Sequence, residues 1–111
     1  MIDYAQIRYL LTEAIRYSDI AYNKIKHIKE DYIEQKLSEL QYWSSSFELV
    51  RNCLYDCTDA YYGKLDIKEV IIELQEDIEN YVLVNKNIKM LEVKELDIVY
   101  QNIVKIRGLL S

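Results

Sequence analysis

The chain has no proline, and its 111 residues include two glycines, two cysteines and one histidine. This composition excludes a collagen-like sequence and disfavours a turn-rich β-sandwich. Two glycines cannot build a phosphate-binding loop, and neither a P-loop motif nor a GxGxxG motif occurs. One histidine and two cysteines are too few ligands for an ordinary structural zinc site. The sequence therefore predicts neither a cofactor nor a metal ion.

A long apolar run is also missing. The longest stretch without a charged residue covers residues 40–47, far short of the about 18 apolar residues that cross a bilayer. The first residues lack the basic start and the apolar stretch of a cleaved signal peptide. We therefore expect a cytoplasmic protein that does not contact membranes, with export without a cleaved signal as the alternative.

The chain does contain enough apolar material for one folded domain. Half of the residues are hydrophobic and 30% are charged, so a core can form under a polar surface. A disordered tail is excluded, because such segments have too few apolar residues to build a core. No linker, repeat or low-complexity segment divides the chain, and we expect a single helical bundle domain over residues 1–111.

Apolar residues recur at alternating steps of four and three from the start of the chain, which is the period of an α-helix. Asp3 and Gln6 have the spacing of a capping box at the beginning of this helix. The middle of the seam is made of small residues, so a neighbouring helix can approach closely there. The first seam comprises Ile7, Leu11, Ala14, Ser18, Ala21, Ile25, Ile28 and Tyr32.

The register of this pattern slips by one residue at Tyr32, which predicts a tight turn or a kink near residues 29–32. A second helix follows and ends at Gly63, because glycine commonly terminates helices. A single bent helix through both segments is the alternative. The second seam comprises Ile33, Leu37, Leu40, Trp43, Phe47, Val50, Leu54, Cys57 and Tyr61.

Two further helices are predicted after Gly63. Asp66 and Glu69 mark the start of the third helix, and an Asn-Lys-Asn turn at residues 85–87 separates it from the fourth. Residues 81–93 could instead pair as a short hairpin. The predicted fold class is all-α, a single compact up-and-down bundle of about four helices. Its predicted core comprises Ile7, Leu11, Ile25, Leu40, Trp43, Phe47, Leu54, Leu74, Ile78, Val99 and Ile103.

The sequence contains no recognisable set of catalytic residues. His27 falls outside the first seam and lies among lysines, so we expect it to face solvent and not to act as a base. Cys53 and Cys57 lie on one helix face without further metal ligands, and we expect buried structural thiols. The sequence therefore predicts that the protein is not an enzyme.

Negative charge is concentrated in one short segment. Residues 66–79 carry six acidic residues against Lys68, and their net charge of −5 equals that of the whole chain. Such an acidic chain is an unsuitable direct ligand for nucleic acid, whose phosphates would repel it. Four of these residues share one side of the third helix and are called the acidic ridge: Asp66, Glu69, Glu73 and Glu76. The ridge is either a solvated helix face or a docking surface for a basic partner.

Tyrosine is the second unusual feature, because eleven tyrosines make up about a tenth of the chain. Tyrosine tolerates half-exposed positions and is enriched at protein interfaces. The tyrosines outside the seams either border the core or form a contact patch. Tyr55 and Tyr62 are the two that we add to the acidic ridge as candidate partner-binding residues.

Part of the chain resembles the second half of HEPN-type helical bundles, a family of RNase toxins and nucleotidyltransferase partners. The resemblance rests on Arg51, Asn52, Tyr62, Gly63, Asp66, Val70, Glu76 and Asp77. In that family the Arg-Asn pair is followed closely by a catalytic histidine, but here Asp56 or Cys57 stands in its place. The resemblance therefore implies a degenerate HEPN-like bundle without nuclease activity.

Small size, localised acid and abundant tyrosine together favour a non-enzymatic binding protein that inhibits or neutralises a basic partner, possible examples being a toxin or a nuclease. An immunity protein, an antitoxin and a phage-encoded inhibitor of a nucleic-acid-handling enzyme all belong to this class. The alternatives are a self-associating helical assembly subunit, such as a homodimer, and the degenerate HEPN-like bundle.

Overall fold

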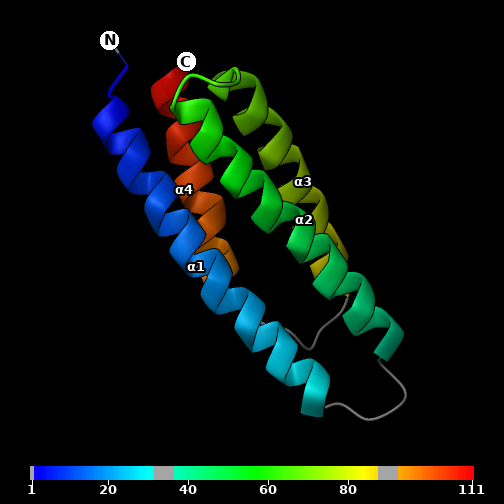
Figure 1. Cartoon of the computed structure of the whole chain (residues 1–111). Helices are drawn as coiled ribbons and strands as arrows, with labels where there is room; N and C mark the ends of the chain where they lie inside the picture. The colour runs from blue at the N-terminus through cyan, green and yellow to red at the C-terminus, as the bar shows by residue number, and fades with distance from the viewer. Residues whose placement is uncertain (1, 32–36, 88–92) are drawn as a thin grey trace.

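The computed structural model describes residues 2–31, 37–87 and 93–111, with side chains except at 29, 31, 37–40, 42, 43 and 81–87. This part of the chain forms four α-helices and no strand (Figure 1). The helices are α1 (Tyr4–Asp31), α2 (Leu37–Tyr61), α3 (Ile67–Asn87) and α4 (Lys94–Leu110). The prediction of an all-α bundle of about four helices is confirmed.

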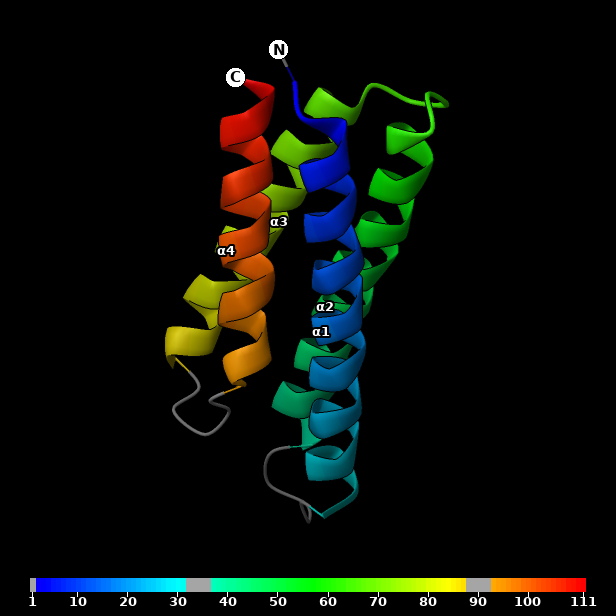
Figure 2. The ribbon, with the colours of Figure 1, turned by 90° about the vertical axis from the view of Figure 1, so that its left-hand side faces the viewer.

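Successive helices run antiparallel around a shared core. Both α1 and α3 pack against α2 and α4, whereas the diagonal pairs make no close contact within the described residues. This is the square arrangement of an up-and-down four-helix bundle. The two chain ends and the turn between α2 and α3 lie together at one end of the bundle (Figures 1 and 2). We call this end the terminal end.

Short-range hydrogen bonds begin two of the helices. The Asp3 carboxylate accepts a hydrogen bond from the backbone N–H of Gln6 at 3.1 Å. The Asp66 carboxylate accepts one from the backbone N–H of Lys68, also at 3.1 Å. Each carboxylate satisfies an amide that has no partner within its helix, and both predicted helix starts are confirmed.

Gly63 ends α2 as predicted. Its φ of +84° lies in the left-handed region that glycine adopts without steric cost. The N–H of Gly63 donates to the Ala60 carbonyl at 3.0 Å, and the N–H of Lys64 donates to the Asp59 carbonyl at 3.2 Å. This pair of bonds is a Schellman motif, which satisfies carbonyls that the end of the helix leaves open.

The described side chains of the two predicted seams line the core in two clusters, whereas those of Tyr32, Ile33 and Leu37 lie outside the described residues. The larger cluster extends toward the terminal end and includes Ile7, Leu54 and Ile106, whereas the smaller one surrounds Phe47. The predicted core residues that are buried are Ile7, Leu11, Ile25, Phe47, Leu54, Leu74, Ile78, Val99 and Ile103. The side chains of Leu40 and Trp43, also predicted to lie in the core, fall outside the described residues.

One prediction and two alternatives about the connections are wrong. A single bent helix through the first half of the chain is excluded, because α1 ends at Asp31 and α2 runs back along it. Residues 85–87 form the last turn of α3 and not a separate turn, and residues 81–87 are helical, which excludes the hairpin. Asparagine is common at helix ends, so residues 85–87 indicated where the helix stops. Residues 32–36 and 88–92 lie outside the described part.

The burial of Phe47 provides a test of the core. Phe47→Ala is expected to lower the free energy of unfolding by about 3–5 kcal/mol, because it empties a fully buried aromatic site. Leu49→Ala is the matched control on the same helix, since the Leu49 side chain is 65% exposed. Chemical denaturation measures both variants. Equal stabilities for the two would contradict this core.

Replacement of the two glycines by alanine is expected to change the stability of the protein in opposite directions. A Cβ at either position would meet nothing within 4 Å apart from the adjoining backbone, so the backbone conformation decides the outcome. Gly63→Ala is expected to destabilise the protein by about 1 kcal/mol, because alanine is strained at positive φ. Gly108→Ala, inside α4, is expected to stabilise it by up to about 1 kcal/mol. Thermal unfolding that shifts in the same direction for both would refute this explanation.

Candidate functional site

The acidic ridge lies on the solvent side of α3. Its four residues are all exposed, whereas Ile71, Leu74 and Ile78 of the same helix are buried. Asp66 stands at the N-cap, where its carboxylate also holds the backbone N–H of Lys68. The predicted placement of the ridge away from the core therefore agrees with the structure.

No acidic residue of α3 forms an ion pair with another residue whose side chain is described. The ion pairs within the described residues are Arg16–Glu13, Lys24–Glu95, Arg51–Asp19 and Lys64–Asp59, and His27 contacts Glu30 at 3.6 Å. All of them involve α1, α2, α4 or the turn after α2. Within the described residues, the carboxylates of α3 therefore take part in no ion pair.

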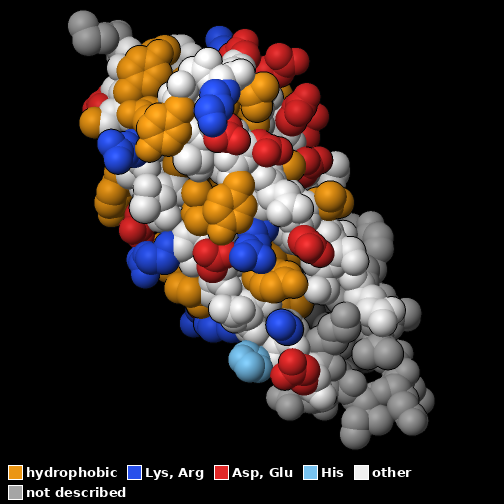
Figure 3. Space-filling view, in the orientation of Figure 1, with side chains coloured by type: hydrophobic (Ala, Val, Ile, Leu, Met, Phe, Trp, Pro, Cys, Tyr) orange, Lys and Arg blue, Asp and Glu red, His pale blue; other side chains and the backbone are white. Residues whose placement is uncertain are grey.

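The acidic surface continues from α3 onto α2. The Cys53 thiol of α2 donates a hydrogen bond to the Asp77 carboxylate of α3 at 3.8 Å. Burial and the negative charges of Asp77, Asp56 and Glu73 together raise the pKa of Cys53, which places these carboxylates around one thiol. Acidic side chains gather over this α2–α3 side in Figure 3. Sequence reasoning left Asp56 out of the site, because helix periodicity does not reveal which helices are neighbours.

Tyr55 belongs to a different cluster, between α1 and α2. The Arg51 guanidinium lies 4.9 Å from the ring centre of Tyr22 and 6.0 Å from that of Tyr55. Its Nε also donates to the Asp19 carboxylate at 2.8 Å. Tyr55 is 45% exposed, so one side of its ring remains available to solvent. The structure therefore separates Tyr55 from the acidic ridge.

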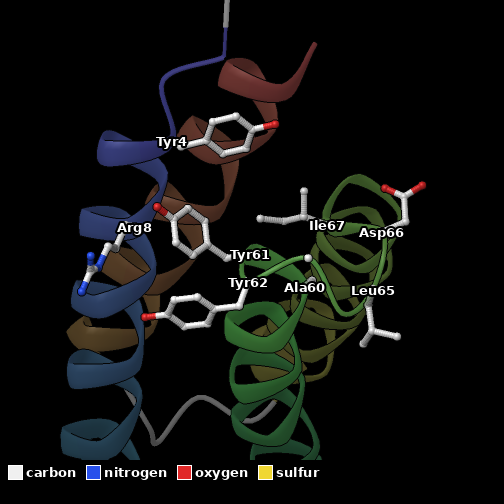
Figure 4. A pocket seen from close by; sticks show the side chains of 9 residues that line it. Tyr4, Arg8, Ala60, Tyr61, Tyr62, Leu65, Asp66 and Ile67 are labelled. Carbon is white, nitrogen blue, oxygen red and sulfur yellow. The ribbon is translucent and has the colours of Figure 1, made fainter.

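Tyr62 lies in an open groove at the terminal end, which we call the tyrosine groove (Figure 4). The Tyr61 ring meets the Tyr4 ring edge-on at 6.2 Å and the Tyr62 ring edge-on at 5.3 Å. Asp66 lies at the margin of the same groove, so Tyr62 is the tyrosine that the fold brings near the ridge. Sequence reasoning missed Tyr4 as part of this group, because the first turn of α1 and the end of α2 meet only in the folded bundle.

His27, the one histidine of the chain, lies at the surface. The side chain of His27 is 78% exposed and lies 3.6 Å from the Glu30 carboxylate, which confirms its predicted exposure. Among the described residues, no group of three or more His, Cys, Asp or Glu side chains is placed to hold a metal ion. None of the described helices is long and apolar enough to cross a membrane.

Comparison of the chain with models of protein families, with curated proteins and with solved structures gives no match. The HEPN-like resemblance therefore receives no support from these comparisons. Any functional conclusion has to rest on the surfaces of the bundle.

Both thiols are poor nucleophiles. Cys57 is buried, and its burial raises the pKa of the thiol to about 12. Cys53 is half-buried, and burial followed by the charge of Asp77 raises its pKa as well. Because the thiolate is the reactive form, both cysteines are held in the unreactive state at neutral pH. This agrees with structural roles, although Cys53 is less buried than expected.

Alkylation by iodoacetamide tests this state of the thiols. In the Cys57→Ala variant, Cys53 is expected to react more slowly in the folded protein than in urea, and faster as the pH rises. Asp77→Asn is expected to accelerate the folded-state reaction, since it removes a charge that opposes the thiolate. A folded-state rate equal to the unfolded rate would contradict the raised pKa.

Proposed function

We propose that the protein is a non-enzymatic binding protein that docks its acidic α2–α3 surface onto a basic protein partner and inhibits it. The observation that supports this most is the complete lack of ion pairs for the α3 carboxylates among the described residues. Self-repulsion of this kind disfavours the isolated helix. A basic surface would relieve it, and the partner class includes toxins and nucleases.

The expected contribution of the ridge is to the rate of encounter. Exposed carboxylates act through a field that reaches about 8 Å at physiological ionic strength, and they steer an oppositely charged partner before contact. Once the complex forms, rim charges contribute less than buried anchors do. We therefore expect the ridge to speed formation of the complex and to have little effect on the rate at which the complex dissociates.

Two exposed tyrosines, Tyr62 and Tyr55, supply candidate anchors outside the acidic ridge. Tyr62 is 62% exposed and borders Asp66 in the tyrosine groove, and Tyr55 is 45% exposed on α2. Tyrosine rings lose little conformational freedom on binding and are enriched where binding energy is concentrated. Their replacement is expected to speed dissociation, in contrast to the effect of the carboxylates on association.

A charge-neutral ridge variant tests the docking surface. It carries Asp66→Asn, which preserves a capping side chain, together with Glu69→Gln, Glu73→Gln and Glu76→Gln. At low salt, the variant is expected to bind a short poly-L-lysine peptide at least tenfold more weakly than the wild-type protein does. Amide shifts of the wild-type protein during this titration should concentrate on α3 and the facing side of α2. Physiological salt should reduce the wild-type affinity toward that of the variant.

A second variant controls for net charge. It removes four carboxylates from the other surfaces, by Glu13→Gln, Glu30→Gln, Glu48→Gln and Asp97→Asn, and is expected to retain most of the affinity. Equal losses in the two variants would contradict a localised docking surface. A stable dimer in light scattering, with no affinity for poly-L-lysine, would favour the self-associating subunit instead. With an isolated basic enzyme partner, inhibition should be stoichiometric and should be lost in the ridge variant.

A further inference from the structure

The tyrosine groove is a second site with a chemistry opposite to that of the ridge. Its volume is about 690 Å³, and its walls come from the first turns of α1, the end of α2 and the start of α3. Tyr4 and Tyr62 are 51% and 62% exposed, so two aromatic rings face solvent beside the half-buried Tyr61. Figure 4 shows the rings of Tyr4, Tyr61 and Tyr62 on the side of α1 that faces the end of α2. The Asp66 carboxylate points away from these rings.

Arg8 gives this groove a positive charge. It is exposed on α1, one turn after Tyr4, and it lines the groove as well as an adjoining hollow of about 190 Å³. In Figure 4 the Tyr62 ring extends toward α1 on the side where Arg8 lies. A guanidinium and two aromatic faces are therefore presented together.

Arg8 differs from the other arginines of the chain in having no bond for its guanidinium among the described residues. Arg16 binds Glu13 at 2.8 Å, Arg51 binds Asp19 at 2.8 Å, and Arg107 donates to the Gln75 side-chain oxygen. In this part of the chain the hydroxyls of Tyr61 and Tyr62 also form no hydrogen bond. The donors of the groove thus form no bond within the described residues, whereas Arg51 and Arg107 join neighbouring helices and Arg16 pairs within α1.

These groups fit a carboxylate better than a phosphate. A single guanidinium can bind one carboxylate through two parallel hydrogen bonds. The single positive charge of Arg8 offsets the whole charge of a carboxylate but only half that of a phosphate dianion, and the net charge of −5 on the chain repels a dianion more strongly than a monoanion. The tyrosine rings then favour an aromatic or aliphatic body attached to the carboxylate.

We propose that the tyrosine groove binds a carboxylate joined to an apolar body, with Arg8 holding the carboxylate and Tyr4 and Tyr62 contacting the apolar part. Two sources share this chemistry: a small free acid, and the C-terminal residue of a peptide. The groove shares Tyr62 and its margin residue Asp66 with the proposed docking surface, but Arg8 lies on α1 outside that surface. Loss of carboxylate binding in an Arg8 variant is therefore distinguishable from loss of binding to a basic partner.

Two ligands that differ only in their head group test whether the groove requires a carboxylate. Each is titrated into the protein, and binding is measured from the amide NMR shifts. The acid 3-phenylpropionate is expected to shift the amides of Arg8, Tyr61 and Tyr62 and to bind at least tenfold more tightly than 3-phenylpropanamide. Equal binding of the acid and the amide would overturn the proposal, and so would tighter binding of phenyl phosphate. The peptide Ala-Ala-Phe with a free C-terminus distinguishes the sources: tighter binding than the free acid indicates a peptide terminus, and weaker binding indicates a small acid.

Variants test the assigned residues. Arg8→Gln is expected to weaken 3-phenylpropionate at least tenfold without altering thermal unfolding, since Arg8 is exposed and holds no partner among the described residues. Arg16→Gln, on the same helix, is the control and should leave the affinity unchanged. Tyr62→Leu is expected to weaken binding more than Tyr62→Phe, which retains the ring. Unchanged affinity in Arg8→Gln would overturn the proposal.

Discussion

The small-residue seam of α1 is the constraint on which the bundle depends. Ala14, Ser18 and Ala21 are fully buried, and α1 makes its most extensive contact with α4. Short side chains at the crossing reduce the distance at which two helices can pack. The Ser18 hydroxyl donates to the Ile15 carbonyl at 2.7 Å, so its burial leaves no unsatisfied donor. The remaining sides of the square are the contacts of α2 with α1 and α3, and of α3 with α4.

Polar contacts at the margins of the core join neighbouring helices. The charged groups outside these contacts remain available to a binding partner. Lys24 pairs with Glu95 between α1 and α4, and Arg51 pairs with Asp19 between α1 and α2. Between α3 and α4, Arg107 donates to the buried side chain of Gln75. The carboxylates on the outer side of α3 and the guanidinium of Arg8 take no part in these contacts. The proposed binding surfaces therefore centre on charged groups that form no ion pair within the described residues, although Asp66 also caps α3.

The helices and most of the core could be predicted from the sequence, because apolar period and helix caps are local properties. Asp3, Gly63 and Asp66 mark helix ends through hydrogen bonds to residues at most four positions away. The ridge could be predicted for the same reason, since its residues share one helix. The tyrosine groove could not, because it joins Tyr4 to Tyr62 through the packing of α1 on α2. A pattern within one helix contains no information about which faces of two helices meet.

The stability of Ala14→Leu tests the central role of the small-residue seam most directly. Ala14 is fully buried in α1, and a larger side chain there should force α1 away from its neighbours. We predict a loss of about 1–3 kcal/mol in the free energy of unfolding, measured by denaturant titration. Ala5→Leu is the control, because Ala5 is exposed on the same helix, and its stability should stay close to that of the wild type. Equal stabilities for the two variants would contradict the close packing of α1.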